Sequence, residues 1–156
     1  MATYTTSCYN DAAVAFPTSG LHLVRVKHTL TAALAQGTSD VLKLCKLPKG
    51  AVIVPQLCEV FSAADPDSGN NATLAMKVTD GTTTKTIISA ANYQAANVRL
   101  TGATTAADIP TLGFFKTGND DFYAYLEPGA NDVDSGAVVY AIVAYTMDTG
   151  RYDSTT

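Results

Sequence analysis

The chain has 156 residues, of which 47% are hydrophobic and 15% charged, and its formal net charge is −4. This length fits one domain that folds without disulfides or metals, and the hydrophobic share excludes an intrinsically disordered chain. The lysines and arginines form no cluster, which argues against nucleic-acid binding. No apolar run approaches the roughly 20 residues of a membrane span, and no secretory signal opens the chain. We therefore expect a soluble protein, made in a cytoplasm, that binds neither nucleic acid nor membrane.

The first twenty residues differ from the rest of the sequence. They are polar, carry the isolated aromatic residues Tyr4, Tyr9 and Phe16, and end in a turn signal at 17–20. They fit either a frayed terminus or an extended arm whose aromatic side chains anchor on a partner. We expect the chain to divide into an N-terminal arm at 1–20, one β-sandwich domain at 21–148 and a flexible tail at 149–156.

Runs rich in β-branched and aromatic residues alternate with turn signals along the chain, and no long stretch has the apolar period of a helix. The alanine-rich stretch 90–96 fits one helical turn or a loop. Many short strands at regular spacing predict an all-β fold built as an antiparallel β-sandwich. The predicted strands are 21–31, 40–47, 51–62, 72–79, 83–89, 98–101, 111–115, 121–126 and 137–147.

Alternation within the strands predicts which side chains face the core. Leu74, Met76 and Val78 share one face, and Phe122, Ala124 and Leu126 face away from Tyr123 and Tyr125. The last strand is apolar on both faces: Val138, Tyr140, Ile142 and Ala144 lie opposite Val139, Ala141, Val143 and Tyr145. Such a strand is either central and covered or part of a subunit interface. The tyrosines favour an interface, because tyrosine offers apolar area with a polar hydroxyl.

The three cysteines, Cys8, Cys45 and Cys58, follow no motif spacing. In a reducing compartment they are small core residues. If residues 48–49 centre a hairpin turn, Cys45 lies opposite Val52, so we expect no disulfide between Cys45 and Cys58.

Neither histidine nor acidic residues suggest a metal site. His22 and His28 share a strand face, but their spacing to Cys45 and Cys58 matches no zinc motif. The polar segment 65–71 fits a hairpin turn better than a calcium loop, because glycine falls one place early and the twelfth position carries no glutamate.

The sequence also lacks a recognisable catalytic motif. It contains no nucleophile elbow, phosphate-binding loop or paired-histidine zinc motif, and only two glutamates, Glu59 and Glu127. Turn chemistry accounts for Asp40, Asp80, Asp120, Asp121, Asp132 and Asp134. We therefore assign no catalytic, cofactor-binding or metal-binding residue and expect a non-enzymatic structural protein.

Four segments carry a resemblance to a known class of proteins. Leu-Pro-x-Gly-Ala at 47–51 follows an apolar strand, and Ala-Thr-Leu-x-x-x-Val-x-Asp-Gly follows at 72–81. Asp-Asp-x-Tyr-x-x-Leu at 120–126 then precedes Ser-Gly-x-Val-x-x-x-Ile-x-x-Tyr at 135–145. In this order of strands and turns, residues 21–148 resemble virion proteins of tailed bacteriophages.

The resemblance implies a jelly-roll-like sandwich that decorates or cements the outer capsid surface, stabilises the head and often forms a homotrimer. The implied partners are the major capsid protein and further copies of the chain, and the implied location is the outside of the virion. The alternative is a head-fibre or tail component that binds a receptor or glycan, with Tyr123, Tyr125 or Tyr145 stacking on sugars.

Overall fold

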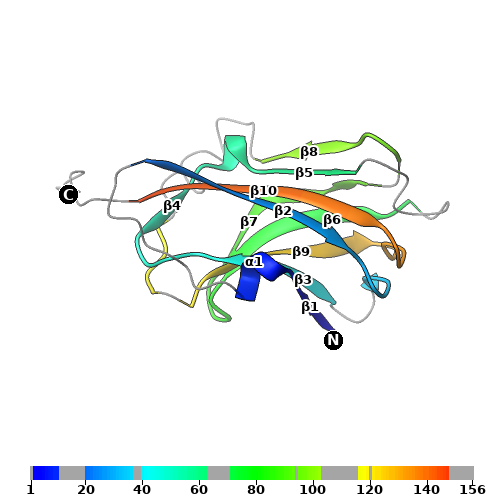
Figure 1. Ribbon diagram of the computed structural model, residues 1–156, viewed down its shortest axis with the longest axis horizontal. Helices are drawn as coiled ribbons and strands as arrows, with labels where there is room; N and C mark the ends of the chain where they lie inside the picture. The colour runs from blue at the N-terminus through cyan, green and yellow to red at the C-terminus, as the bar shows by residue number, and fades with distance from the viewer. Residues whose placement is uncertain are drawn as a thin grey trace.

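The protein is a sandwich of two β-sheets, shown in Figure 1. The computed structural model describes residues 2–10, 20–36, 40–62, 71–93, 95–102, 116–119 and 121–147. The elements are β1 (Thr3–Thr5), α1 (Ser7–Asn10), β2 (Leu21–Thr29), β3 (Val41–Lys46), β4 (Ala51–Ile53), the 3-10 helix η2 (Pro55–Leu57), β5 (Glu59–Ser62), β6 (Thr73–Thr79), β7 (Thr84–Asn92), β8 (Arg99–Thr101), β9 (Tyr123–Ala130) and β10 (Val138–Met147). Sheet A has the order β1-β3-β9-β6-β7, and sheet B has the order β2-β10-β5-β8, with β4 also beside β10.

The strand order is that of a jelly roll. Leaving β1 and β4 aside, the remaining eight strands pair antiparallel as β2 with β10, β3 with β9, β5 with β8, and β6 with β7. The first strand therefore pairs with the last, the second with the seventh, and so on inward, as when one long hairpin is rolled into two sheets. The predicted antiparallel, jelly-roll-like sandwich is confirmed.

Seven of the nine predicted strands correspond to single strands, namely β2, β3, β6, β7, β8, β9 and β10. The predicted strand 51–62 is interrupted, because η2 begins at Pro55, which has no N–H to donate to a sheet. The stretch 90–96 begins as strand, since β7 extends to Asn92. The predicted strand 111–115 lies outside the described residues.

The hairpin turn considered at 48–49 does not form. Strand β3 belongs to sheet A, whereas β4 belongs to sheet B, so the chain crosses between the sheets here. Cys45 lies opposite Ala124, and Val52 lies opposite Thr146. Gly50 allows the sharp turn, because its φ of +84° is one that residues with a Cβ rarely adopt.

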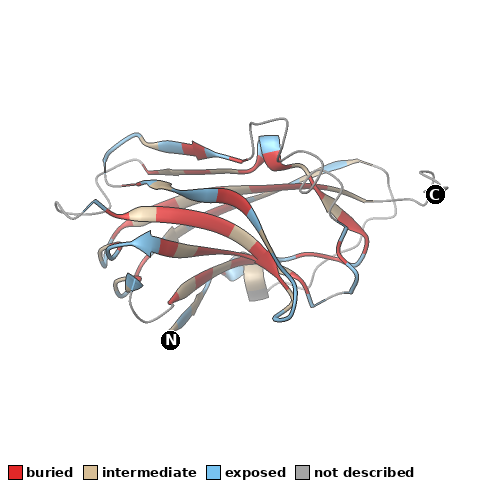
Figure 2. Ribbon diagram, turned by 180° about the vertical axis from the view of Figure 1, so that it is seen from behind, coloured by how far each residue is buried: buried red, intermediate tan, exposed pale blue. Residues whose placement is uncertain are grey.

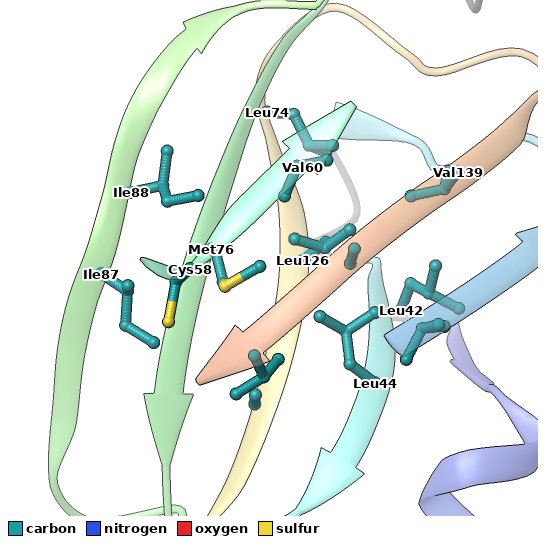
Figure 3. Packing of buried hydrophobic residues seen from close by; sticks show 14 of the residues in the cluster. Leu42, Leu44, Cys58, Val60, Leu74, Met76, Ile87, Ile88, Leu126 and Val139 are labelled. Carbon is teal, nitrogen blue, oxygen red and sulfur yellow. The ribbon is translucent and has the colours of Figure 1, made fainter. Parts of the chain in front are cut away.

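The core lies between the sheets and contains the side chains that the alternation predicted. Figure 3 shows Leu74, Met76 and Leu126 of sheet A meeting Val60 and Val139 of sheet B. All five are at most 1% exposed. Burial alternates along β2 and the first half of β10, whereas β6, β9 and the second half of β10 each contain three consecutive buried residues; Figure 2 shows how much of the strands is buried. Removal of this apolar surface from water, at roughly 25 cal/mol per Å², is the main force that holds the sheets together.

The N-terminal residues pack on the chain's own sheet A. Strand β1 pairs in parallel with β3, with Thr3 beside Val41. The buried hydroxyl of Thr6 donates a 2.6 Å hydrogen bond to the carbonyl oxygen of Leu44. Sheet A therefore begins inside the segment 1–20 that was predicted to be an arm, while residues 11–19 lie outside the described part.

Candidate interaction surface

The outward side chains of sheet B form a surface that we call the B face. It consists of Leu21, Leu23, Arg25 and Lys27 from β2, Tyr140 and Ile142 from β10, Glu59 and Phe61 from β5, and Arg99 and Thr101 from β8. Strand register places these residues in rows, because paired residues of neighbouring strands point to the same side. One row across the four strands reads Lys27, Tyr140, Phe61, Arg99, and the next reads Arg25, Ile142, Glu59, Thr101.

An aromatic pair occupies the middle of the B face. The rings of Phe61 and Tyr140 stack with their centroids 4.8 Å apart and their planes 8° from parallel. The Nζ atom of Lys27 lies 5.6 Å from the centroid of the Tyr140 ring, within the range of a cation–π interaction. Both rings are half-buried. They form an ordered apolar centre that still has surface to offer a partner.

Exposed aliphatic side chains extend this centre. Leu21 and Leu23 are 50% and 45% exposed, and Leu57 of η2 is 42% exposed. Among the described residues these are the large hydrophobic side chains with the greatest exposure, and two of them belong to the B face. On β10, Ala144 lies beside Leu23 and Thr146 lies beside Leu21, so the neighbours of the two leucines on that strand carry no charge. Contiguous apolar surface of this kind is typical of interaction sites.

The margins of the B face are basic. Arg25, Lys27 and Arg99 give three positive charges, and Glu59 gives one negative charge, which leaves two formal positive charges. Arg99 forms an ion pair with Glu59 while remaining 64% exposed. A pair this exposed contributes little to stability, so its charges remain usable by a partner. An apolar, aromatic centre with a charged rim matches the general anatomy of protein interfaces.

The outward side of sheet A, the A face, is partly occupied by the chain itself. Tyr9 of α1 packs edge-on against Tyr123, with ring centroids 5.8 Å apart. The Nζ atom of Lys43 lies 4.3 Å from the Tyr123 centroid and 5.1 Å from the Tyr9 centroid. Lys43 thus bridges the helix α1 to the sheet. The sequence predicted no role for Lys43, because only the folded chain places Tyr9 beside β3.

The three tyrosines considered for sugar binding do not form one platform. Tyr123 and Tyr125 point outward from sheet A, as predicted, but Tyr125 is only 8% exposed. Burial raises the pKa of Tyr125 to about 12, with smaller contributions from Glu127 and Tyr123. Tyr145 is 7% exposed and stacks on His22 in the interior, so the prediction of an exposed Tyr145 is wrong. The physical reason is strand parity, since Tyr145 shares the inward side of β10 with Val143.

The two glutamates lie on opposite outer faces of the sandwich. Glu59 belongs to the B face, whereas Glu127 lies on the A face and pairs with Lys77. They cannot flank one bond of a substrate as the two carboxylates of a glycosidase do.

Cys45 and Cys58 are buried, and no disulfide joins them. The Cys58 thiol lies 3.5 Å and 3.7 Å from the carbonyl oxygens of Val54 and Ala144, and burial raises its pKa to about 11. In the described part of the chain, no three histidine, cysteine, aspartate or glutamate residues group as metal ligands, and no helix is long and apolar enough to cross a membrane. The segment 65–70 lies outside the described residues.

Aspartates collect in the connections between strands, as turn chemistry predicted. Asp40, Asp80, Asp121, Asp132 and Asp134 all lie outside the strands. The Oδ1 atom of Asp80 accepts hydrogen bonds from the N–H groups of Thr82 and Thr83, at 2.9 Å and 2.7 Å. Asp132 likewise accepts a 2.8 Å bond from the N–H of Gln36. These aspartates therefore lie in the connections between strands, while the two faces carry most of the described cations.

Comparison with known proteins finds no matching family model and no similar curated sequence. Two solved structures share the fold. A chain in the capsid of Ralstonia phage GP4 superposes with a TM-score of 0.64 at 18% identity, covering 95% of this chain and 99% of that chain. A chain in the cyanophage Pam1 capsid asymmetric unit superposes with a TM-score of 0.51 at 16% identity, covering 88% of this chain and 94% of that chain. This fold therefore occurs in chains of two phage capsids, over nearly the full length of each.

Proposed function

We propose that the protein is a phage capsid decoration, or cement, protein that binds the outer surface of the shell and stabilises the head. Its role is structural and non-enzymatic. It is located on the outside of the virion, its partner is the major capsid protein, and it assembles as a homotrimer whose N-terminal segment serves as an arm.

The observation that carries the proposal is the likeness to chains of two phage capsids. The likeness covers 95% of this chain and 99% of one of these capsid chains, so it extends over nearly the full length of both. The resemblance in strand and turn order over 21–148 supports the same class independently of the structure. The B face adds a surface that is suited to protein contacts.

The physical requirements of such a role match the molecule. A decoration protein needs a rigid body and a contact surface, and many copies on one shell multiply weak contacts through avidity. The jelly roll provides the rigid body, because its apolar core joins both sheets. The aromatic and aliphatic centre of the B face provides contact area without a catalytic group.

Reconstitution on capsids that lack the protein tests the proposal. Purified protein should bind such capsids saturably, and cryo-electron microscopy should show the sandwich on the outer surface. Decorated capsids should also release their contents at a higher temperature than bare ones. Density at a fibre tip or tail, with no binding to bare capsids, would favour the receptor-binding alternative.

Mass photometry tests the oligomeric state separately. We expect a species with the mass of three copies of the 16.3-kDa chain. A stable monomer at the concentrations that saturate capsids would contradict the trimer without affecting the assignment to the capsid.

A further inference from the structure

We propose that the B face is the surface by which the protein attaches to the shell, and that it fits a partner surface with apolar side chains at its centre and carboxylates at its margin. This inference rests on the proposed function and adds to it the attachment surface and the chemistry of the partner.

The two outer faces of the sandwich differ in how far the chain covers them. On sheet A, α1 packs over β3, and Tyr9, Lys43 and Tyr123 contact one another. On sheet B, the outward aromatic pair and the exposed Leu21 and Leu23 have no described segment packed over them comparable to α1. The apolar surface still open to a partner is therefore concentrated on the B face.

The charge of the B face selects the kind of partner. Its outward positions carry two net positive charges, although the whole chain carries −4. Arg25 and Lys27 line one margin, and Arg99 lines the other. Cations on both sides of an apolar centre favour a surface whose carboxylates lie on both sides of an apolar patch, because complementary charges steer association and set its orientation.

The same charges disfavour a second B face as the occupant. If two copies met face to face, Arg25, Lys27 and Arg99 of one copy would approach the same cations of the other. If two β2 strands instead paired edge to edge, Arg25 and Lys27 would face their own counterparts along a nine-residue strand. Like charges opposite one another are destabilising, and lysine on an edge strand is a common protection against sheet extension. An acidic partner surface therefore fits better than a copy of the same face.

Charge reversal on the B face tests the inference. The variant Arg25→Glu reverses the charge of an exposed residue of β2, and the control Lys49→Glu makes the same change in charge at an exposed residue beyond the end of β3. Both are titrated onto bare capsids at low and moderate salt. We expect the B-face variant to lose affinity by about 10-fold and the control by less than about 2-fold, and wild-type affinity to fall as salt rises.

A second variant tests the apolar centre. Leu23→Ser removes an exposed side chain that the core does not need, so the fold should persist, and capsid affinity should fall by about 10-fold. Circular dichroism and thermal unfolding confirm that each variant is folded before binding is measured.

The outcomes separate this inference from the proposed function. If wild-type protein binds and the B-face variants bind as well as the control, attachment uses another surface and the inference is wrong, although the capsid role stands. If the B-face variants change the oligomer mass and leave capsid affinity intact, the B face joins copies of the chain, which also overturns it. If wild-type protein binds no capsid, the proposed function fails and this inference fails with it.

Discussion

Thr117 shows how one buried hydroxyl fixes the crossing between the two sheets. Its Oγ1 atom donates a 2.6 Å hydrogen bond to the carbonyl oxygen of Pro48 and accepts a 2.9 Å bond from the N–H of Ala51. Its backbone adds bonds to Gly50 and Ala51, at 3.0 Å and 2.9 Å. Thr117 thus holds the turn that begins where β3 ends.

We expect Thr117→Val to lower the free energy of unfolding by about 1–2 kcal/mol, because the N–H of Ala51 and the carbonyl oxygen of Pro48 each lose their bond to the hydroxyl and keep only the 3.1 Å bond between them. Thr117→Ser keeps the hydroxyl and should cost about 1 kcal/mol or less, from the lost methyl group. Urea denaturation monitored by tyrosine fluorescence measures both. Equal stability of the two variants would show that the hydroxyl does not hold the turn.

Alkaline pH should destabilise the fold through buried tyrosines. Burial raises the pKa of Tyr125 to about 12 and also raises that of Tyr93, whereas both titrate near about 10 in the unfolded chain. At pH values between the unfolded and the folded pKa of each tyrosine, the unfolded state loses its phenolic proton first. It then binds fewer protons than the folded state, so the free energy of unfolding falls as pH rises. Below about pH 9 these groups should leave stability unchanged.

Unfolding experiments between about pH 9 and about pH 11.5 check this expectation. The Tyr125→Phe variant removes one of the shifted groups, so its stability should fall less steeply with pH than that of wild-type protein. Identical slopes would show that Tyr125 titrates alike in both states.

At the scale of elements, the anchoring of α1 on β3 depends on aromatic and cation–π contacts. Tyr9→Ala should release residues 7–10 from the A face, since the ring meets Tyr123 and the Nζ atoms of Lys43 and Lys46. We expect faster hydrogen exchange at the amide of Thr6, which bonds to the carbonyl of Lys43, with little change in global stability.

Tyr9→Phe is the matched control, because it keeps the ring and loses only the hydroxyl that lies 3.4 Å from Lys43 Nζ. Its exchange rates should stay near those of wild-type protein. Unchanged exchange in Tyr9→Ala would show that β1 alone holds this segment.

The sequence predicted elements well where alternation was strong, and poorly where long-range pairing decides. Leu74, Met76 and Val78 alternate with polar neighbours, so β6 and its inward face were predictable. Strand β1 was missed because Thr3–Thr5 is too short and polar to show a pattern. The turn after β3 has the local chemistry of a hairpin, and only the pairing of β4 with β10 shows that the chain changes sheets.

The candidate surface was predictable only in part. The sequence predicted that β10 is apolar on its outward side and left two interpretations open. In the structure β10 is central in sheet B, and its outward side is half-exposed. The rows of the B face could not be predicted, because Phe61, Tyr140 and Arg99 are far apart in the chain and meet only through the register of β5, β8 and β10. Periodicity assigns a side chain to a face but does not identify its neighbours across strands.

At the scale of the whole molecule, the jelly roll is closed by its last strand. Strand β10 pairs with β2 from Thr146 beside Leu21 to Val138 beside Thr29, and on its other edge it pairs with β4 and β5. Sheet B therefore cannot be completed until β10 has been synthesised. Such long-range pairing also predicts folding in milliseconds to seconds, slower than in proteins dominated by local contacts.

Truncations at the C-terminus test this dependence on β10. A chain ending at residue 137 loses the central strand of sheet B, together with the inward Val139, Ala141 and Val143, so it should not fold. A chain ending at Met147 keeps every described strand and should unfold within a few degrees of the full-length protein. Far-ultraviolet circular dichroism and thermal unfolding compare the two chains. A cooperative transition in the shorter chain would mean that sheet A and the remaining strands form a core without β10. The structure argues against this outcome, because only β10 connects β2 to β5 in sheet B.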